Sequence, residues 1–346
     1  MYTTSMPDLS NTLITKIKTS IASIYKYMYI DYINNKHTSY HIFCQIVGVT
    51  FREKVFMKKY KGELLMLITA VMWGSGFVGM AVGLEHWSVM QLMALRFTLA
   101  TILLAVIFNK KLRLITKSVF CKGSILGAIL FTAFALQTLG LEYTTPSKNA
   151  FSTSINVIVV PIIAYIIYKR RFDRYEILAA LIAIFGIGYL SLQDSFTMNF
   201  GDMLSILCAI AFAFDIFYTN VFVKKEDALA LTIVQFLAAS ILSWIGVIAL
   251  GEIPTTASTE GILTIVYLAF FCTLIAYACQ NIGMQYADPT KSALILSTES
   301  IFGTLFSVLL LSEVLTGRII FGACLIFAAI IIAEVKPSFK KSMINA

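Results

Sequence analysis

Apolar residues in this chain form long runs that are separated by short polar segments. From residue 57 onward there are ten such runs of about 18–22 residues, each long enough to cross a ~30 Å hydrocarbon core as a helix. The intervening loops are short, so none is expected to form a separate soluble domain. The pattern predicts an all-α polytopic membrane protein with ten transmembrane helices, at about 63–82, 90–108, 120–140, 148–168, 176–192, 202–222, 229–250, 262–284, 291–311 and 318–334.

The composition supports this class of protein. Hydrophobic residues make up 58% of the 346 residues and charged residues only 13%, which is more apolar surface than a soluble domain of this length can bury. The net charge is +8, but the basic residues flank the apolar runs, so membrane topology accounts for them and nucleic acid is not an expected partner. The six Cys show no CxxC pair and the three His no metal-ligand spacing, so no metal or cofactor is expected.

An internal repeat organises the chain. The stretch QTLGLEYTTPSKNA, from Gln137 to Ala150, recurs as QNIGMQYADPTKSA from Gln280 to Ala293, and six positions are identical. Each copy joins two apolar runs through a polar elbow, centred on Pro146 in the first and Pro289 in the second. Further residues align at an offset of 139, so we expect two five-helix repeats, at 57–195 and 196–346.

Residues 1–56 differ from the rest, because they are rich in Ser, Thr, Asn and Tyr and contain no long apolar run. They are expected to be a disordered or interfacial extension, with a mildly amphipathic stretch at about 13–33. The alternative is that translation starts at Met57, where MKKYKGELLML reads as a basic lead-in to the first span.

The distribution of basic residues predicts the orientation. If the N-terminus is cytoplasmic, the cytoplasmic segments carry 20 Lys and Arg residues, whereas the outer loops carry only Lys148 and Arg318. This asymmetry favours cytoplasmic N- and C-termini. Each repeat then has an odd number of spans, so the two repeats are inverted, an arrangement from which many secondary transporters derive alternating access.

Three stretches resemble the EamA-type branch of the drug/metabolite transporter superfamily: AVMWGSGFVG (70–79), MALRFTLATILL (93–104) and LSTESIFGTLFSVLLLSEVLTG (296–317). The resemblance covers about 62–336 and departs at Ser300, where the family usually has Pro, and at Ser312, where it often has Gly. It implies secondary export of small metabolites (amino acids, amines or drug-like compounds) across the cytoplasmic membrane, without ATP. The expected partners are the substrate and the lipid bilayer, with proton coupling and a homodimer left open.

Ionisable residues inside a span are functional candidates, because burying a charge in a membrane is costly. Glu299 is the first choice, since its carboxyl group could bind a proton or a cationic substrate in one facing state and release it in the other. Asp215 lies past the middle of its span, and both a transport role and a helix–helix hydrogen bond are open. Arg96 is expected to snorkel to the cytoplasmic side or to order packing, and Glu313 to be a helix-end residue.

Uncharged polar residues supply the other candidates. Asn149, Ser152, Thr153 and Asn156 fall at helical spacing on one stripe, which is expected to face a cavity or another helix instead of lipid. Asn156 is the repeat partner of Glu299, so the two are expected at equivalent depths. Three further residues are expected beside the path: Trp73, which could stack on an organic substrate, and the equivalent pair Gln137 and Gln280.

These residues predict a substrate site near the midplane between the repeats, with Pro146 and Pro289 as hinges or gates. Two other classes of function remain open. A membrane-embedded enzyme acting on a lipid-linked substrate would need a cluster of acidic, His or Arg residues at one membrane face, and none is visible in the sequence. A passive facilitator or channel would show flux that does not saturate.

Overall fold

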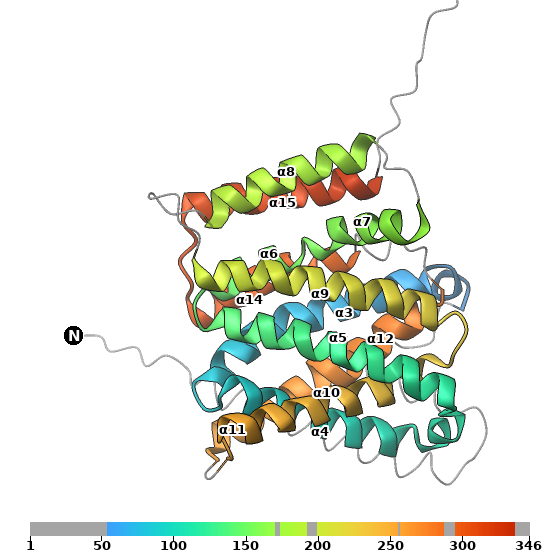
Figure 1. The fold of residues 1–346 in the computed structure, drawn as a ribbon. Helices are drawn as coiled ribbons and strands as arrows, with labels where there is room; N and C mark the ends of the chain where they lie inside the picture. Colours follow the sequence, from blue (N-terminus) through green and yellow to red (C-terminus); the bar gives the residue numbers. More distant parts are fainter. Residues whose placement is uncertain (1–53, 170–173, 192–198, 255–256, 287–294, 336–346) are drawn as a thin grey trace, which may run out of the picture. The chain divides into compact units, whose positions relative to one another are not determined.

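A computed structural model describes residues 54–169, 174–191, 199–254, 257–286 and 295–335. The predictions for residues 1–53 and for Pro289 therefore lie outside the described residues. Residues 59–346 form one compact unit, shown in Figure 1. The main helices are α3 (Lys54–Leu84), α4 (Val89–Ile107), η1 (Asn109–Leu114), α5 (Lys117–Leu141), α6 (Pro146–Thr153), α7 (Asn156–Tyr168), α8 (Arg174–Ser191), α9 (Phe200–Phe222), α10 (Ala228–Leu250), α11 (Thr259–Tyr267), η2 (Leu268–Ile275), α12 (Ala276–Gly283), α14 (Glu299–Leu311) and α15 (Gly317–Val335).

Within the described part of the chain, seven helical segments are long and apolar enough to cross a membrane. They are Lys61–Leu84, Val89–Ile107, Lys117–Leu141, Pro146–Ile167, Phe200–Phe222, Ala228–Leu250 and Thr259–Gly283. Three shorter apolar helices, Ile177–Gly186, Ile295–Leu311 and Gly317–Ile332, coincide with the fifth, ninth and tenth predicted spans. The prediction of an all-α, multi-pass fold is confirmed, while the count of ten crossings stays a prediction.

Helix starts follow local capping chemistry. The elbow that opens α6 places Pro146 in the first turn, where its missing N–H costs nothing, and the Thr145 side chain accepts a hydrogen bond from the Lys148 backbone N–H. Asp227 caps α10 in the same way, because its carboxylate accepts from two backbone N–H groups of the first turn. Short polar residues between apolar runs therefore fix where the helices begin.

The fourth and ninth predicted spans are both broken at the same place in the repeat. Residues Ser154 and Ile155 form a turn between α6 and α7, and Thr298 forms one just before α14. After each break a 13-residue helix begins, α7 at Asn156 and α14 at Glu299. The offset between these two residues is that of the duplicated elbow, so the break belongs to both copies of the repeat.

Hydroxyl groups explain the breaks. The Ser154 Oγ donates to the Phe151 carbonyl oxygen at 2.8 Å and the Thr298 Oγ1 to the Ile295 carbonyl oxygen at 2.6 Å, and such local bonds compete with the helical ladder. Both half-helices also end alike, at residues with left-handed backbone: Lys169 (φ 55°) after α7 and Ser312 (φ 56°) after α14.

Glycine contacts join the two halves at equivalent points. Gly140, at the end of α5, lies against Gly201 at the start of α9, where an added Cβ on Gly201 would approach the Gly140 carbonyl oxygen to 2.5 Å. Gly283 is the repeat equivalent of Gly140, and Gly62 is that of Gly201. These two glycines are also close, because a Cβ added to Gly283 would lie 3.3 Å from the Gly62 carbonyl oxygen. The third helix of each half therefore packs closely on the first helix of the other.

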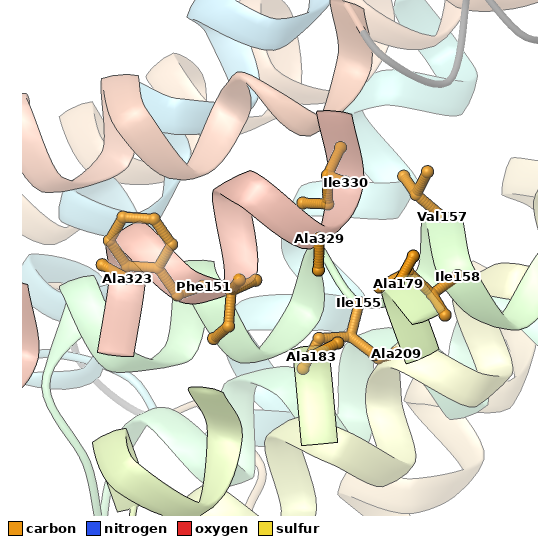
Figure 2. Packing of buried hydrophobic residues seen from close by; sticks show 11 residues of the cluster. Phe151, Ile155, Val157, Ile158, Ala179, Ala183, Ala209, Ala323, Ala329 and Ile330 are labelled. Atoms are coloured by element: carbon orange, nitrogen blue, oxygen red, sulfur yellow. The ribbon is translucent and has the colours of Figure 1, made fainter. Parts of the chain in front are cut away.

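Inside the compact unit, α5 packs against both α9 and α10, α10 packs against α4, and α14 packs against α6. Helices α8 and α15 lie side by side (Figure 1). Figure 2 shows the apolar cluster that joins this pair to the broken helix, to which α6 and α7 contribute Phe151 and Ile158, α8 contributes Ala183 and α15 contributes Ile330. Burial of these side chains fixes α6 and α7, and with them the polar residues that follow.

The outer surface of the helices is apolar. Ile166 on α7, Phe185 on α8, Ile248 on α10 and Leu309 on α14 each expose more than 60% of their surface. Polar groups such as Asn149, by contrast, are fully buried. An apolar exterior around a polar interior is what a lipid solvent favours, since lipid offers polar groups no hydrogen-bond partner.

Candidate functional site

Polar side chains from six helices meet in one cavity. Its empty volume is about 460 Å³ when the part open to solvent is included. The polar lining comes from α4, α5, α6, α7, α9 and α14, and consists of Arg96, Gln137, Thr153, Asn156, Asp215 and Glu299.

Aromatic rings form the rest of the wall. Tyr277 is fully buried and contacts Trp73, with ring centroids 5.2 Å apart, and Phe134 packs edge-on against Phe212 at 5.1 Å. The two pairs are joined, because Phe134 and Tyr277 lie 6.4 Å apart. The Trp73 indole N–H and the Tyr277 hydroxyl are buried and have no hydrogen-bond partner in the described structure, so the wall offers unused polar atoms as well as ring faces.

Glu299 lies at the start of the half-helix α14, with 5% of its surface exposed. The structure shows no hydrogen bond or ion pair between its carboxyl group and any described residue. Its position depends on a close helix crossing, since Gly74 of α3 faces the Glu299 backbone and an added Cβ there would lie 2.9 Å from the Glu299 carbonyl oxygen. Asn156 holds the equivalent place at the start of α7 and lines the same cavity.

Asp215 is the second acidic group of the cavity, and only 2% of it is exposed. Its Oδ1 accepts a hydrogen bond of 2.8 Å from the Gln235 Nε2 on α10. One side of the carboxyl group is therefore held by a neighbouring helix. The structure shows the helix–helix hydrogen bond and places Asp215 at the cavity, while its role in transport stays a prediction.

A short polar network supports the cavity wall behind the carboxyl groups. The Gln137 Nε2 donates to the Thr153 Oγ1 at 3.3 Å, and the Asn149 Nδ2 donates both to the Gln137 carbonyl oxygen at 3.1 Å and to the Ser205 Oγ at 3.0 Å. These bonds tie α6 to α5 and α9. The two cavity residues Gln137 and Thr153 are thereby fixed in place.

Of the two expectations for Arg96, snorkelling is wrong, because its side chain is only 3% exposed and lines the cavity. It makes packing contacts and pairs with no acidic side chain of the described residues. The Nε donates to the Thr273 Oγ1 at 2.6 Å, and the guanidinium carbon lies 4.3 Å from the centre of the Phe134 ring. Thr273 belongs to the π-helical segment η2, a type of irregularity that is frequent at functional sites.

Three predicted site residues are buried beside the cavity without lining it: Asn149, Ser152 and Gln280. The stripe from Asn149 to Asn156 assumed one continuous helix, and the turn at Ser154 interrupts it. The Gln280 amide and the Ser152 hydroxyl have no hydrogen-bond partner among the described residues. Pro146 lies in the elbow at the start of α6, outside the lining.

The sequence patterns did not indicate Tyr277 as a cavity residue and did not place Arg96 in the cavity. The only available signal for Tyr277 was its position one helical turn before Gln280, in a run of otherwise apolar residues. In the described part of the chain, no group of three or more His, Cys, Asp and Glu side chains is placed to hold a metal ion. The chemistry of the cavity therefore rests on two carboxyl groups, one guanidinium, amides, hydroxyls and aromatic rings.

A family model described as the EamA-like transporter family matches this chain twice, over residues 60–192 and 199–334. The chain belongs to the EamA-like transporter family. It is a multi-pass membrane protein of a transporter family, which agrees with the resemblance found in the sequence. The two matches meet between α8 and α9, so each contains one of the two broken helices compared above.

Curated relatives of this EamA-like chain carry transporter names. A protein of Archaeoglobus fulgidus called an uncharacterized transporter is 32% identical over 81% of this chain and 88% of its own length. A probable amino-acid metabolite efflux pump of Escherichia coli is 25% identical over 79% of this chain and 94% of its own. One solved crystal structure covers 80% of this chain and 98% of that chain, with a TM-score of 0.62 at 16% identity, which shows a shared fold.

Proposed function

We propose that this protein is a secondary transporter that exports small organic metabolites, such as amino acids, amines or drug-like compounds, across the cytoplasmic membrane by alternating access. The observation that carries the proposal is the cavity between the helices of the two halves, in which Glu299 and Asp215 face the same space. The name of the Escherichia coli relative, a probable amino-acid metabolite efflux pump, supports the substrate range and the direction.

Alternating access requires that the cavity be closed on one side at a time. The elbow before α6 makes three polar contacts that support such a closure. Ser147 donates its backbone N–H and its hydroxyl to the Glu313 carboxylate at 3.3 and 2.8 Å, and the Lys148 Nζ lies 3.8 Å from the Asp202 Oδ2. The distribution of basic loops assigns this elbow to the outer side, so we interpret these contacts as the outer closure, with Pro146 as its hinge.

Glu299 is the proposed coupling group. Its carboxyl group has no competing partner in the described structure, so a proton or the ammonium group of a substrate can occupy it in turn. The other titratable or charged side chains that line the cavity are Arg96, Asp215, Cys272 and Tyr277. Binding of a proton and binding of the substrate would then be mutually exclusive at one site, which is the requirement for antiport.

The test is counterflow in proteoliposomes that are loaded with a pool of unlabelled amino acids and amines, with and without an imposed pH gradient. Wild-type protein is expected to accumulate labelled solute by exchange, with rates that saturate. Glu299→Gln is expected to exchange solute but to lose the response to the gradient, because the amide cannot take up a proton.

Two outcomes contradict the proposal. Flux that rises linearly with concentration and shows no counterflow indicates a passive channel. Equal responses of wild type and Glu299→Gln to the gradient exclude Glu299 as the coupling group, while leaving exchange itself intact. The outer loop variant Glu85→Gln, a change of the same kind at an exposed position, serves as the matched control.

A further inference from the structure

We infer that Arg96 binds the carboxylate of the transported molecule, so that the cavity selects zwitterions that carry an ammonium group, a carboxylate and an apolar side chain. This inference rests on the proposed transport function and specifies its substrate class. It follows from the geometry of the Arg96 guanidinium, which is buried, turned toward the cavity and not neutralised by any acid that the structure describes.

The guanidinium lacks a counter-ion. A charged group inside a membrane protein is costly unless it is paired or serves a ligand, yet no Asp or Glu oxygen of a described residue lies within 4.0 Å of the Arg96 nitrogens. A guanidinium has five N–H donors. Two of them bond to the Thr273 Oγ1 (2.6 Å) and the Cys272 carbonyl oxygen (3.5 Å), so three remain for a ligand.

The surrounding groups hold the guanidinium in place. The Phe134 ring lies 4.3 Å from its central carbon, and the Phe97 ring lies at 5.7 Å, so one face is covered and the side chain cannot swing freely. The Thr273 bond fixes its Nε edge, and Thr273 is itself anchored through a bond from its Oγ1 to the Leu268 carbonyl oxygen in η2. A planar fork fixed in this way suits a carboxylate, which accepts two parallel N–H bonds.

The rest of the cavity completes the recognition of a zwitterion. Glu299 and Asp215 line the same space, yet both lie outside the 4.0 Å ion-pair distance from Arg96, so positive and negative groups occupy separate positions in it. The aromatic wall formed by Trp73, Phe212 and Tyr277 is suited to an apolar side chain. A substrate bridging the two charged positions would satisfy both and would neutralise Arg96.

The experiment compares compounds that differ only in the carboxylate: L-phenylalanine with phenethylamine, and L-leucine with isoamylamine. Counterflow and ligand-induced thermal stabilisation are both measured for wild type, Arg96→Gln and Arg96→Lys. Arg96→Gln is expected to lose at least about tenfold in apparent affinity for the two amino acids while its affinity for the amines changes little. The affinity of Arg96→Lys for the two amino acids is expected to lie between those of wild type and Arg96→Gln, because an ammonium group keeps the charge but not the planar fork.

Arg113→Gln, the same change at an exposed arginine of η1, is the control and should behave as wild type. Equal losses for amino acids and amines in folded Arg96→Gln or Arg96→Lys would show that Arg96 only orders packing and would overturn the inference. Wild type that exchanges the amines but neither amino acid would also overturn it, while leaving transport intact. Wild type that neither exchanges nor is stabilised by any of the four compounds would also overturn the inference, and the pooled counterflow experiment described above tests the transport function separately.

Discussion

Asn156 and Glu299 occupy equivalent places in the two halves of the protein: each is the first residue of a 13-residue helix that follows a break, and both line one cavity. One position carries an amide and the other a carboxyl group, so the cavity combines a symmetric framework with asymmetric chemistry. For proton-coupled transport, it is enough that one of the two equivalent positions carries a titrating group.

Exchanging the two side chains tests this equivalence. Glu299→Asn alone is expected to abolish the response of exchange to a pH gradient. Adding Asn156→Glu is expected to restore part of that response, because the carboxyl group returns to the same cavity from the opposite half. Proteoliposome counterflow at two external pH values measures this, and a double variant no better than Glu299→Asn would show that the carboxyl group works only from α14.

Gly74 is predicted to be intolerant of a side chain. An added Cβ would lie 2.5 Å from the Phe302 Cβ and 2.8 Å from the Gly303 backbone nitrogen, so α14 and Glu299 must shift. Gly74→Ala is expected to lower the free energy of unfolding by about 1–3 kcal/mol, despite the better helix propensity of Ala. Thermal unfolding in detergent measures the effect. Gly317→Ala, where a Cβ meets nothing within 4 Å, should leave the midpoint unchanged.

Pro146 is predicted to affect the rate of cycling more than the affinity for substrate. It begins α6 beside the contacts of Ser147 with Glu313, and its ring limits the backbone conformations open to the elbow. Pro146→Ala is therefore expected to lower the maximal exchange rate several-fold while the thermal shift induced by substrate stays the same. Pro254→Ala, in a different loop, is the control, and an unchanged rate in Pro146→Ala would reject the hinge role.

The loop between α9 and α10 is predicted to carry a small acid-sensitive contribution to stability. Lys122 and Ser118 donate hydrogen bonds to the Glu226 Oε1 and thereby hold the pKa of that carboxyl below its ordinary value of 4.5. Because the pKa of Glu226 is lower in the folded state than in the unfolded state, the contact stabilises the folded state above the unfolded-state pKa. This stabilisation is lost as the pH falls through the folded-state pKa. In Glu226→Gln, the thermal unfolding midpoint should depend less on pH between about pH 6 and 3 than it does in wild type. An unaltered dependence on pH would contradict this. The contribution is small because the ion pair lies at a loop and both of its side chains are partly exposed to solvent.

Much of the fold and of the site could be predicted from the sequence alone. The lengths of the apolar runs and the duplicated elbow indicated the membrane class and the two halves, because hydrocarbon thickness and repeat periods leave direct marks in a sequence. Glu299, Asp215, Asn156 and Thr153 were predicted to line a cavity for a similar reason. Polar groups within a span must be turned away from lipid, so their presence alone indicates an interior surface.

Only the tertiary structure decided which interior surface each polar group faces. Helical spacing predicts that Asn149 and Asn156 share a face, but the turn at Ser154 rotates α7 relative to α6, so one lines the cavity and the other bonds to α5 and α9. Arg96 and Tyr277 meet in the cavity from α4 and α12 through packing between helices distant in sequence. The helical period determines which way each side chain points from its own helix. Which neighbour that side chain contacts depends on how the helices cross, and close contacts such as those at Gly74 set the crossing.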